Sequence, residues 1–562
     1  MTKKKTKENK ILLLLFLLCI CFSFSNYLIL TKDNTPFHYD ILDSYLLSKK
    51  LYNSFTTFGV SGLFYSIAND YDKDYPILFI LQPFPFFYVF GVFEDSAAFS
   101  NIPYIFILIF STYFIGKELK NKKAGFIACL ILLFISGILS FSRVYLPVFP
   151  LTSIFMLSVF IFLRTKNFKK TNYSFGLGII AALGLLIKYT FVLYLFPFVF
   201  SFLLENLITN IKKKNKLIEE IQIKNFFYFV CTFLTISILG YLSFSSSSAF
   251  INSKSAWPSV LGYLSIAHTT FGSGNIITYI FKVSYEFIKR SNILFLGIYP
   301  LIILSFIYSL YTTLKNKILR PLIMCVCLSF FLVIYIGPVP RFILPLVPLL
   351  IILLSINFVE IYNYLKKKKR LEKFNFNHFV LTVLVFIILL FSIGLIKEKK
   401  KNHFQDVYFK GILSPSSEFK SLKNITQDIK LVSKNNSEIL ILQDSPIMHA
   451  LNYRLNNDFI VHHPFFCLSD PATRKSDIEC NTSLYLNENK LCSFDIILHS
   501  NKYMRTQQIN EIKLMYKERL EVLNQILVNF ENCKTNYSLF SNYSNVPLQY
   551  NETSNILIYV KN

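Results

Sequence analysis

The sequence predicts an α-helical multispanning membrane protein with about eleven transmembrane helices and a small C-terminal α/β or α+β domain outside the membrane. Hydrophobic residues form 53% and aromatic residues 17% of the 562-residue chain, more than a soluble globular domain usually carries. Apolar runs of about 17–25 residues recur between residues 11 and 396. Each is long enough to cross the roughly 30 Å of hydrocarbon in a bilayer as a helix.

The first apolar run, residues 11–30, follows a basic N-terminal segment, residues 1–10, which we expect in the cytoplasm. We interpret the run as a retained anchor rather than a cleaved signal peptide, because it is long and no small-x-small cleavage site closes it. The transmembrane domain then extends over residues 11–396. The other predicted spans are residues 97–116, 124–141, 148–163, 173–187, 190–208, 225–246, 291–312, 321–337, 342–364 and 378–396.

Clusters of Lys and Arg between the apolar runs predict the topology, because such clusters stay on the cytoplasmic side. The net charge of +25 resides in these clusters rather than along one continuous face, so we expect no nucleic-acid partner. One cluster, residues 397–403, falls outside in this scheme, next to the lipid headgroups. Five clusters fall inside when the spans alternate from a cytoplasmic N-terminus: KELKNKK (117–123), RTKNFKK (164–170), KKKNK (212–216), LKNKILR (314–320) and KKKKRLEK (366–373).

A further apolar run, residues 75–91, is short and contains Pro76, Pro83 and Pro85, which disfavour an uninterrupted helix. We interpret it as a helix or re-entrant segment at the outer interface, because counting it as a span would place the 117–123 cluster outside. Residues 31–96 then form one large outer loop. Its acidic residues are Asp40, Asp43, Asp72, Asp74, Glu94 and Asp95.

Residues 397–562 are polar and are predicted to form a separate extracytoplasmic domain. Strand-like runs at residues 437–444 and 492–500, with a helical pattern near residues 506–530, indicate an α/β or α+β domain. An even number of cysteines fits an oxidising compartment, with the pairing left open. Six N-x-S/T sequons fit a glycosylated surface, and chance in an Asn-rich chain explains them equally well. These residues are Cys467, Cys480, Cys492 and Cys533, and Asn424, Asn435, Asn481, Asn536, Asn542 and Asn551.

Six local strings stand in an order that resembles a known group of membrane enzymes. They are HYDILDSYLLSKKL, DYPILFIL, FGVFEDSAAFSNIPYIFILIFSTYFIGKEL, FSRVYLPVFPLTSIFML, GLGIIAALGLLIKYTFVLYLFP and PRFILPLVPLL. Their order, over about residues 10–360, resembles the GT-C glycosyltransferases, in particular the protein O-mannosyltransferase and aminoarabinose transferase group (glycosyltransferase family 39-like). Two positions depart from the family pattern, which has acids where this chain has Ile41 and Val148.

The resemblance implies a GT-C type membrane glycosyltransferase that moves a sugar from a polyprenyl-phosphate-linked donor to an acceptor on the extracytoplasmic side, with inversion. The donor would be a dolichyl- or undecaprenyl-type phosphate carrying a hexose or pentose. The acceptor would be a lipid, glycan or protein. Such an enzyme would be an integral multi-pass protein of the cell membrane, in contact with membrane lipids and acting in cell-envelope glycosylation.

Two other functional classes share some of these features. A transporter or flippase of a lipid-linked sugar would also need outer cations and a lipid groove. It is expected to show paired repeats and polar residues near midspan, which the sequence does not display. A receptor or scaffold that anchors the tail domain would leave the large acidic loop unexplained.

Asp40 is the candidate catalytic base under this interpretation, because an incoming hydroxyl needs a carboxylate within hydrogen-bond reach to accept its proton. If this stretch is helical, Asp43 lies one turn later on a neighbouring position of the same face and could replace the acid lost at Ile41. Asp74 matches another acidic position of the family and could assist acceptor or metal positioning. The alternative is that Asp40 and Asp43 only complement a helix dipole, and that Asp74 is an ordinary solvated residue.

Three cations are candidates for binding the donor phosphate. Arg143, Lys188 and Arg341 each lie at the predicted outer end of a span, against the positive-inside tendency. Cations near hydrocarbon usually have a counter-charge or a function, and Arg can bind phosphate bidentately while Lys acts as a point charge. The alternative is that these side chains reach lipid phosphates at the membrane surface.

A divalent metal ion is a possible cofactor. His38 and Asp40 form a candidate ligand pair, because imidazole and carboxylate suit several divalent ions. A histidine at an interface is more often a plain polar contact. The identity of any cofactor therefore stays open in the sequence.

Overall fold

The protein consists of two compact units, each with its own internal packing. The helical unit comprises Met1–Leu30 and Asp43–Lys401, and the sheet unit comprises Thr31–Leu42 and Asn402–Asn562. The computed structural model describes residues 2–31, 39–70, 76–213, 223–244, 298–313, 319–336, 340–367, 376–400, 429, 431, 438–442, 460–462, 496–500, 537–547 and 553–561.

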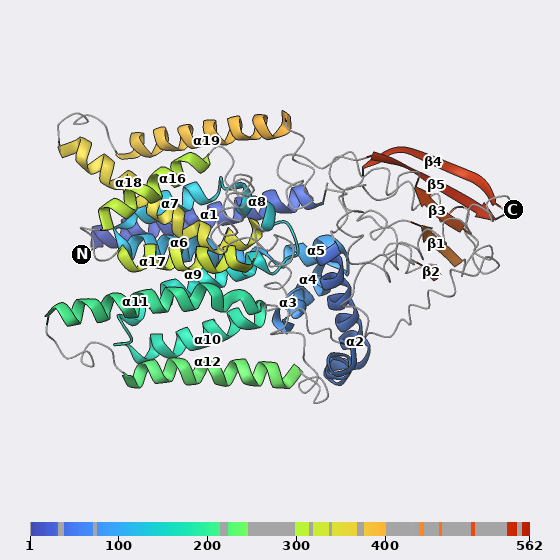
Figure 1. Ribbon diagram of the computed structural model, residues 1–562, viewed down its shortest axis with the longest axis horizontal. Helices are drawn as coiled ribbons and strands as arrows, with labels where there is room; N and C mark the ends of the chain where they lie inside the picture. Colours follow the sequence, from blue (N-terminus) through green and yellow to red (C-terminus); the bar gives the residue numbers. More distant parts are fainter. Residues whose placement is uncertain are drawn as a thin grey trace, which may run out of the picture. The chain divides into compact units, whose positions relative to one another are not determined.

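The helical unit is built from apolar helices that follow the predicted hydrophobic runs (Figure 1). Each of the eleven predicted spans overlaps a helix in the part of the chain that the structure describes. The spans at 97–116 and 124–141 are each divided between two α-helices. The helices are α1 (Thr2–Leu30), α2 (Tyr39–Asp70), α3 (Ile77–Leu81), α4 (Phe84–Phe90), α5 (Glu94–Phe99), α6 (Ile102–Leu119), α7 (Lys122–Leu132), α8 (Ser136–Phe141), α9 (Val148–Thr165), α10 (Thr171–Ile187), η1 (Tyr189–Phe191), α11 (Val192–Lys213), α12 (Ile223–Phe244), α16 (Tyr299–Thr313), α17 (Arg320–Ile336), η3 (Pro340–Leu346), α18 (Val347–Lys367) and α19 (Phe376–Lys400).

The length and composition of these helices make the chain an integral membrane protein. Five stretches of the described residues are long and apolar enough to cross a bilayer, and six shorter apolar helices accompany them. The count of about eleven spans stays a prediction. The five long stretches are Asn9–Leu30, Glu94–Leu119, Val148–Thr165, Ile223–Gly240 and Arg341–Lys367.

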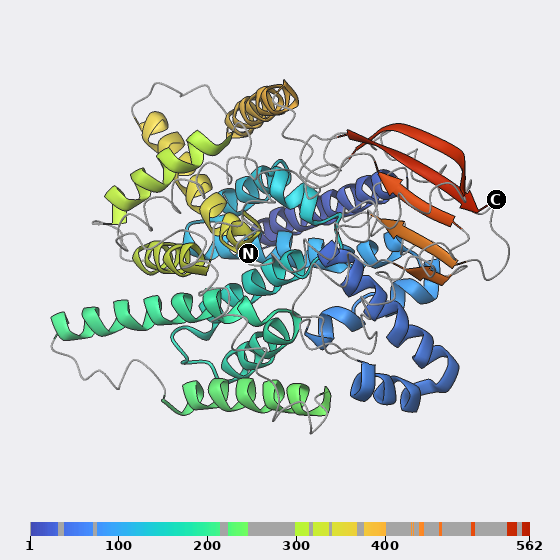
Figure 2. The same ribbon diagram turned by 45° about the vertical axis from the view of Figure 1, so that its right-hand side comes forward.

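Neighbouring helices pack side by side along the unit. α9 packs against α6 and α10, and α10 also packs against α12, an arrangement that is visible from two directions (Figure 1, Figure 2). In addition, α7 packs against α6 and α18, and α11 packs against α17. Apolar side chains such as Leu13, Phe196, Leu304 and Phe331 stay exposed on the outer helix surfaces, as expected where lipid is the solvent.

The acidic outer loop predicted at residues 31–96 is largely helical. Its longest element, α2, contains a sharp kink at Gly59, whose φ of 66° lies in the left-handed region that glycine adopts without strain. The two arms of the helix fold back on one another, so that the Ser66 hydroxyl donates a hydrogen bond to Ser54 Oγ at 2.7 Å (Figure 2). The proline-rich run at 75–91 forms the short helices α3 and α4 rather than one continuous helix.

Ion pairs connect two of the basic clusters that are predicted inside to each other and to α18. Arg164 Nη2 lies 3.0 Å from Glu118 Oε1, which joins the last turn of α9 to the end of α6. Lys120 Nζ lies 2.6 Å from Glu360 Oε1 near the end of α18. These partly exposed pairs contribute little stability. The two pairs do place the clusters at 117–123 and 164–170 at a common end of the helical unit, together with Glu360.

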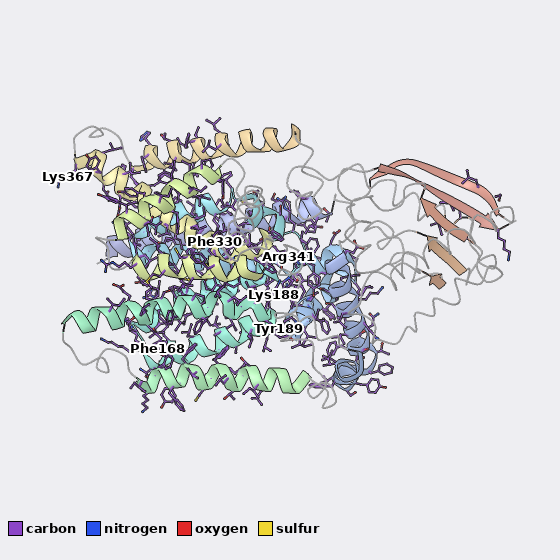
Figure 3. All side chains as sticks on the ribbon, in the orientation of Figure 1. Phe168, Lys188, Tyr189, Phe330, Arg341 and Lys367 are labelled. Atoms are coloured by element: carbon purple, nitrogen blue, oxygen red, sulfur yellow. The ribbon has the colours of Figure 1, made fainter. Side chains whose placement is uncertain are left out.

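Residues predicted inside and residues predicted outside lie at opposite ends of the helical unit. Phe168 and Lys367, which belong to clusters predicted inside, lie at one end (Figure 3). Lys188 and Arg341, which are predicted outside, lie at the opposite end of the helices (Figure 3). This segregation agrees with the topology predicted from the positive-inside rule.

The sheet unit contains a five-stranded mixed sheet in the order β2-β1-β3-β5-β4. Strands β1, β2 and β3 are parallel, while β5 is antiparallel to both β3 and β4. The strand-like runs at 437–444 and 492–500 contain β1 and β3, and the helix expected at 506–530 lies outside the described residues. The strands are β1 (Glu438–Leu442), β2 (Ile460–His462), β3 (Ile496–Ser500), β4 (Tyr537–Pro547) and β5 (Thr553–Lys561).

A close approach between α6 and α7 gives a test of the helical packing. A Cβ added to Gly116 would lie 2.7 Å from Gly125 Cα, and one added to Gly125 would collide with the Tyr113 carbonyl oxygen. Gly125→Ala should therefore lower the free energy of unfolding by about 1–3 kcal/mol, because the helices must separate. Thermal unfolding of the purified protein in detergent measures this loss.

Gly176→Ala in α10 is the matched control, since its added Cβ meets no heavy atom within 4 Å. We expect this variant to unfold at or slightly above the wild-type temperature, because alanine favours helix. Equal melting temperatures for Gly125→Ala and Gly176→Ala would contradict the close packing of α6 on α7.

Candidate functional site

Two of the three predicted phosphate-binding cations come together at one aromatic ring. Lys188 Nζ lies 5.6 Å from the centroid of the Phe342 ring, and Arg341 Cζ lies 5.8 Å from the same centroid. Both side chains are partly exposed and lie at the same end of the helical unit (Figure 3). A ring face attracts cations, and two neighbouring positive groups form a site that favours an anion.

The turn between α10 and α11 positions Lys188. The backbone leaves helical geometry at Lys188, with φ −159° and ψ 128°, so the side chain projects from the end of α10. The Lys188 N–H donates to the Gly184 carbonyl and the Lys188 carbonyl accepts from the Phe191 N–H, both at 3.0 Å. A Cβ at Gly184 would lie 2.5 Å from the buried Phe191 ring. The turn therefore requires glycine at this position.

A hydrogen bond from α11 fixes the segment that carries Arg341. Arg341 and Phe342 lie in η3, a short 3-10 helix before α18. The buried Tyr194 hydroxyl donates to the Phe342 carbonyl oxygen at 2.7 Å. Tyr194 lies a few residues after Lys188 in the chain, so this bond joins the two cation-bearing segments directly.

Arg143 occupies a different environment, against α1. Its side chain is 6% exposed, and its Nε donates to Asn26 Oδ1 at 2.9 Å. The Asn26 amide in turn donates to Ser142 Oγ at 2.9 Å. Burial of a guanidinium in a membrane protein is costly without such partners. Whether Arg143 also serves the donor phosphate stays a prediction.

A buried polar network surrounds the turn that carries Arg143. Asn101, which precedes α6, is fully buried, and its amide donates to the Val144 carbonyl at 2.8 Å. The Gln82 amide donates to Ser100 Oγ at 2.6 Å. These residues were not among the sequence candidates. The available signal was the presence of Asn and Gln within or beside apolar runs, where polar side chains need partners.

The predicted acids lie partly outside the described residues. Asp40 and Asp43 occupy the second and fifth positions of α2, so the stretch is helical as required for their shared face. Nothing is described of their side chains. His38 and Asp74 lie outside the described residues altogether, although α3 begins three residues after Asp74. The roles of all four stay predictions.

The segment after Asp74 lies close to the cation pair. α3 packs against α10, the helix that ends at Lys188 (Figure 1). Among the described residues, no group of three or more His, Cys, Asp or Glu side chains could hold a metal ion. His38 and the Asp40 side chain lie outside that search, so the possible metal site also stays a prediction.

Comparison with known proteins relates this arrangement to a family. Residues 76–221, about a quarter of the chain, match the family model of dolichyl-phosphate-mannose-protein mannosyltransferase. No curated protein matches the sequence.

Solved structures give a likeness over nearly the whole chain. ArnT from Cupriavidus metallidurans in the apo state has a TM-score of 0.53 and 12% identity, covering 98% of both chains. ArnT from the same organism bound to undecaprenyl phosphate has a TM-score of 0.51 and 12% identity, covering 97% of both. The Archaeoglobus fulgidus oligosaccharyltransferase in the apo form has a TM-score of 0.51 and 10% identity, covering 97% of this chain and 74% of that one. The predicted resemblance to GT-C glycosyltransferases is confirmed, and at this identity the likeness shows the fold.

The hydrogen bond from Tyr194 to η3 gives a test of the site geometry. Tyr194→Phe should lower the free energy of unfolding by about 1 kcal/mol, the usual net value of one hydrogen bond. It should also speed amide hydrogen exchange in residues 340–346, because η3 loses its tie to α11. Exchange followed by mass spectrometry measures the second effect.

Tyr362→Phe is the control, because Tyr362 is also buried but lies in α18 beside the Phe376 ring. It should leave exchange in residues 340–346 unchanged. If Tyr194→Phe also leaves that exchange unchanged, the hydrogen bond does not hold η3 in place.

Proposed function

We propose that this chain, which has the GT-C fold, transfers a sugar from a polyprenyl-phosphate-linked donor to an acceptor on the extracytoplasmic side of the membrane, with inversion at the anomeric carbon. The observation that carries the proposal is the convergence of Lys188 and Arg341 on the Phe342 ring at the end opposite the basic clusters. The match of residues 76–221 to a family described by a dolichyl-phosphate sugar supports the donor class. ArnT, one of the similar structures, is bound to undecaprenyl phosphate.

The cation pair would stabilise the phosphate that leaves the sugar. Negative charge develops on this phosphate as the bond between its oxygen and the anomeric carbon breaks. Arg341 can offer two parallel N–H donors to the phosphate oxygens, and Lys188 can supply a point charge. Partial burial beside an aromatic ring strengthens both interactions relative to bulk water.

An aspartate would receive the proton from the acceptor hydroxyl. In this proposal Asp40 is the base, and it accepts the proton while the hydroxyl oxygen forms its bond to the opposite face of the anomeric carbon. Asp43 would share this task in place of the acid that Ile41 replaces, and Asp74 would help to orient the acceptor. The position of Asp40 at the start of a helix on the predicted outer side supports this role.

Loss of the base gives the direct test of catalysis. Asp40→Asn should reduce sugar transfer about 100-fold or more, since general base catalysis contributes roughly that factor. The measurement uses purified protein in lipid with a labelled polyprenyl phosphate sugar and a mixture of candidate acceptors, including water as the hydrolytic acceptor. Asp70→Asn, at the other end of α2, is the matched control and should retain wild-type transfer.

Two outcomes would contradict the proposal at different levels. Undiminished transfer by Asp40→Asn would remove Asp40 as the base. Movement of the labelled donor across the bilayer by the wild type without any transfer would identify a flippase and exclude the enzyme.

Donor binding tests the cations separately from the chemistry. Lys188→Met and Arg341→Gln should each weaken binding of undecaprenyl phosphate by about 10- to 100-fold, because a hydrogen bond to a charged group contributes roughly 1.5–3 kcal/mol. Binding of radiolabelled lipid to protein in detergent micelles measures the affinity without any turnover.

Arg320→Gln is the matched control for Arg341→Gln. Arg320 lies at the start of α17, where its Nη1 is 3.5 Å from Glu205 Oε1. This variant should bind undecaprenyl phosphate as the wild type does. If Lys188→Met and Arg341→Gln also bind undecaprenyl phosphate with wild-type affinity, the phosphate binds elsewhere.

A further inference from the structure

Tyr145 joins three segments of the chain that are far apart in sequence. It lies in the turn between α8 and α9 and is fully buried. Its hydroxyl lies 2.9 Å from the Phe79 carbonyl oxygen in α3 and 2.8 Å from Ser48 Oγ in α2. Its ring stacks on the Phe79 ring, with centroids 4.5 Å apart and an angle of 18° between planes.

The available hydroxyl hydrogens limit these bonds. Ser48 Oγ also lies 2.8 Å from the Ser44 carbonyl oxygen, so three contacts compete for two hydroxyl hydrogens. The Tyr145 hydroxyl donates to the Phe79 carbonyl oxygen, and the Ser48 hydroxyl donates to the Ser44 carbonyl oxygen or to the Tyr145 oxygen. We call this set of contacts between Ser48, Tyr145 and Phe79 the tyrosine clasp.

The clasp joins α2, the helix that contains Asp40 and Asp43, to α3, the helix that follows Asp74. Ser48 lies in α2, which contains Asp40 and Asp43 in its first five residues, and Ser44 and Ser48 follow Asp40 at intervals of four residues. Phe79 lies in α3, which begins three residues after Asp74. Ser44, Ser48 and Phe79 are all fully buried, so these parts of α2 and α3 are fixed in the protein interior.

The same turn is anchored from its other side. Asn101 donates to the Val144 carbonyl, and Arg143 donates to Asn26 of α1. Residues 142–147 are thus held by α1 and by the start of α6, and Tyr145 extends from this fixed turn to α2 and α3. The clasp also includes α3, which packs on α10, the helix leading to Lys188.

We propose that Tyr145 is a positioning residue for the sugar transfer, acting through the tyrosine clasp on the helix that carries the base. This inference rests on the proposed function. A fully buried tyrosine does not touch the substrate, so its effect operates through the placement of α2 and α3. A base must lie within hydrogen-bond reach of the proton it accepts, and a displacement of about 1 Å can reduce the rate roughly 100-fold.

Tyr145→Phe removes the clasp and leaves the surrounding structure intact. The stacked ring remains, Ser48 can donate to the Ser44 carbonyl, and the Phe79 carbonyl still accepts from the Gln82 N–H at 3.3 Å. No buried group is left without a hydrogen-bond partner by the change, so the variant should fold. Ser48→Ala removes the same connection from the other side.

The experiment compares Tyr145→Phe, Ser48→Ala, the double variant and the wild type. In Tyr145→Phe we expect kcat for sugar transfer to fall about 10- to 100-fold while KM for the polyprenyl phosphate donor changes less than about twofold. The double variant should be no slower than Tyr145→Phe alone, because both changes break one chain of hydrogen bonds. Amide exchange in residues 39–50 and 77–81 should speed up in each variant.

Tyr113→Phe is the control, a buried tyrosine in α6. It should leave kcat, and exchange in residues 39–50, at wild-type values. The inference is overturned if Tyr145→Phe retains wild-type kcat and exchange, if its loss appears in KM rather than kcat, or if Tyr113→Phe reproduces it. A wild type without any transfer overturns the proposed function alone. In that case the exchange rates still decide whether the clasp fixes α2 and α3.

Discussion

The candidate site depends on one hydrogen bond between segments that are almost 150 residues apart. Tyr194 donates to the Phe342 carbonyl and so holds η3 against the start of α11, six residues after Lys188. The packing of η3 on α9, α17 and α18 holds the same segment, and the bond adds a direct link to α11. The bond is partly buried, and away from water a hydrogen bond is electrostatically stronger and an unpaired carbonyl is more costly. The hydrogen bond that satisfies the Phe342 carbonyl in η3 therefore also helps to hold Arg341 near Lys188.

A second constraint acts on the turn between α8 and α9. Polar groups at the end of a membrane helix must find partners within the protein or in water. Here Asn26, Asn101 and Ser48 supply these partners, and each comes from a different helix or helix start. The result is a hydrogen-bonded junction at the end of the helical unit. The proposed sugar transfer would need fixed relative positions of the acid, the donor phosphate and the acceptor.

The sequence predicted much of the helical framework and little of the junctions. Apolar length alone located the helices, because every transmembrane segment must satisfy its own backbone. Lys188 and Arg341 are identifiable from the sequence because they are exceptions to the positive-inside rule. A cation at the outer end of a span usually has a counter-charge or a function. The sequence allows a helix around Asp40 and Asp43 but does not predict that it continues to Asp70, because the uncharged stretch around Gly59 lacks the uniform hydropathy of a span. The break of the span at 124–141 was also missed, since Ile135 adopts an extended backbone inside an apolar run.

Tyr145 shows most clearly where sequence reasoning stops. A tyrosine within the apolar string "SRVYLPVF" looks like an ordinary packing residue. Its partners Ser48 and Phe79 also carry no sequence signal that sets them apart from their neighbours. Only their proximity in space gives the hydroxyl a role. Arg143, two residues earlier, was noticed because it is charged, and the structure places it in the same junction through Asn26.

We propose that Lys188 and Arg341 receive the phosphate of a polyprenyl phosphate lipid. Cryo-electron microscopy of the protein in lipid nanodiscs with undecaprenyl phosphate would locate this phosphate. We predict phosphate density within hydrogen-bond distance of both side chains, beside the Phe342 ring. Well-resolved lipid phosphate at a position that contacts neither side chain would contradict the account.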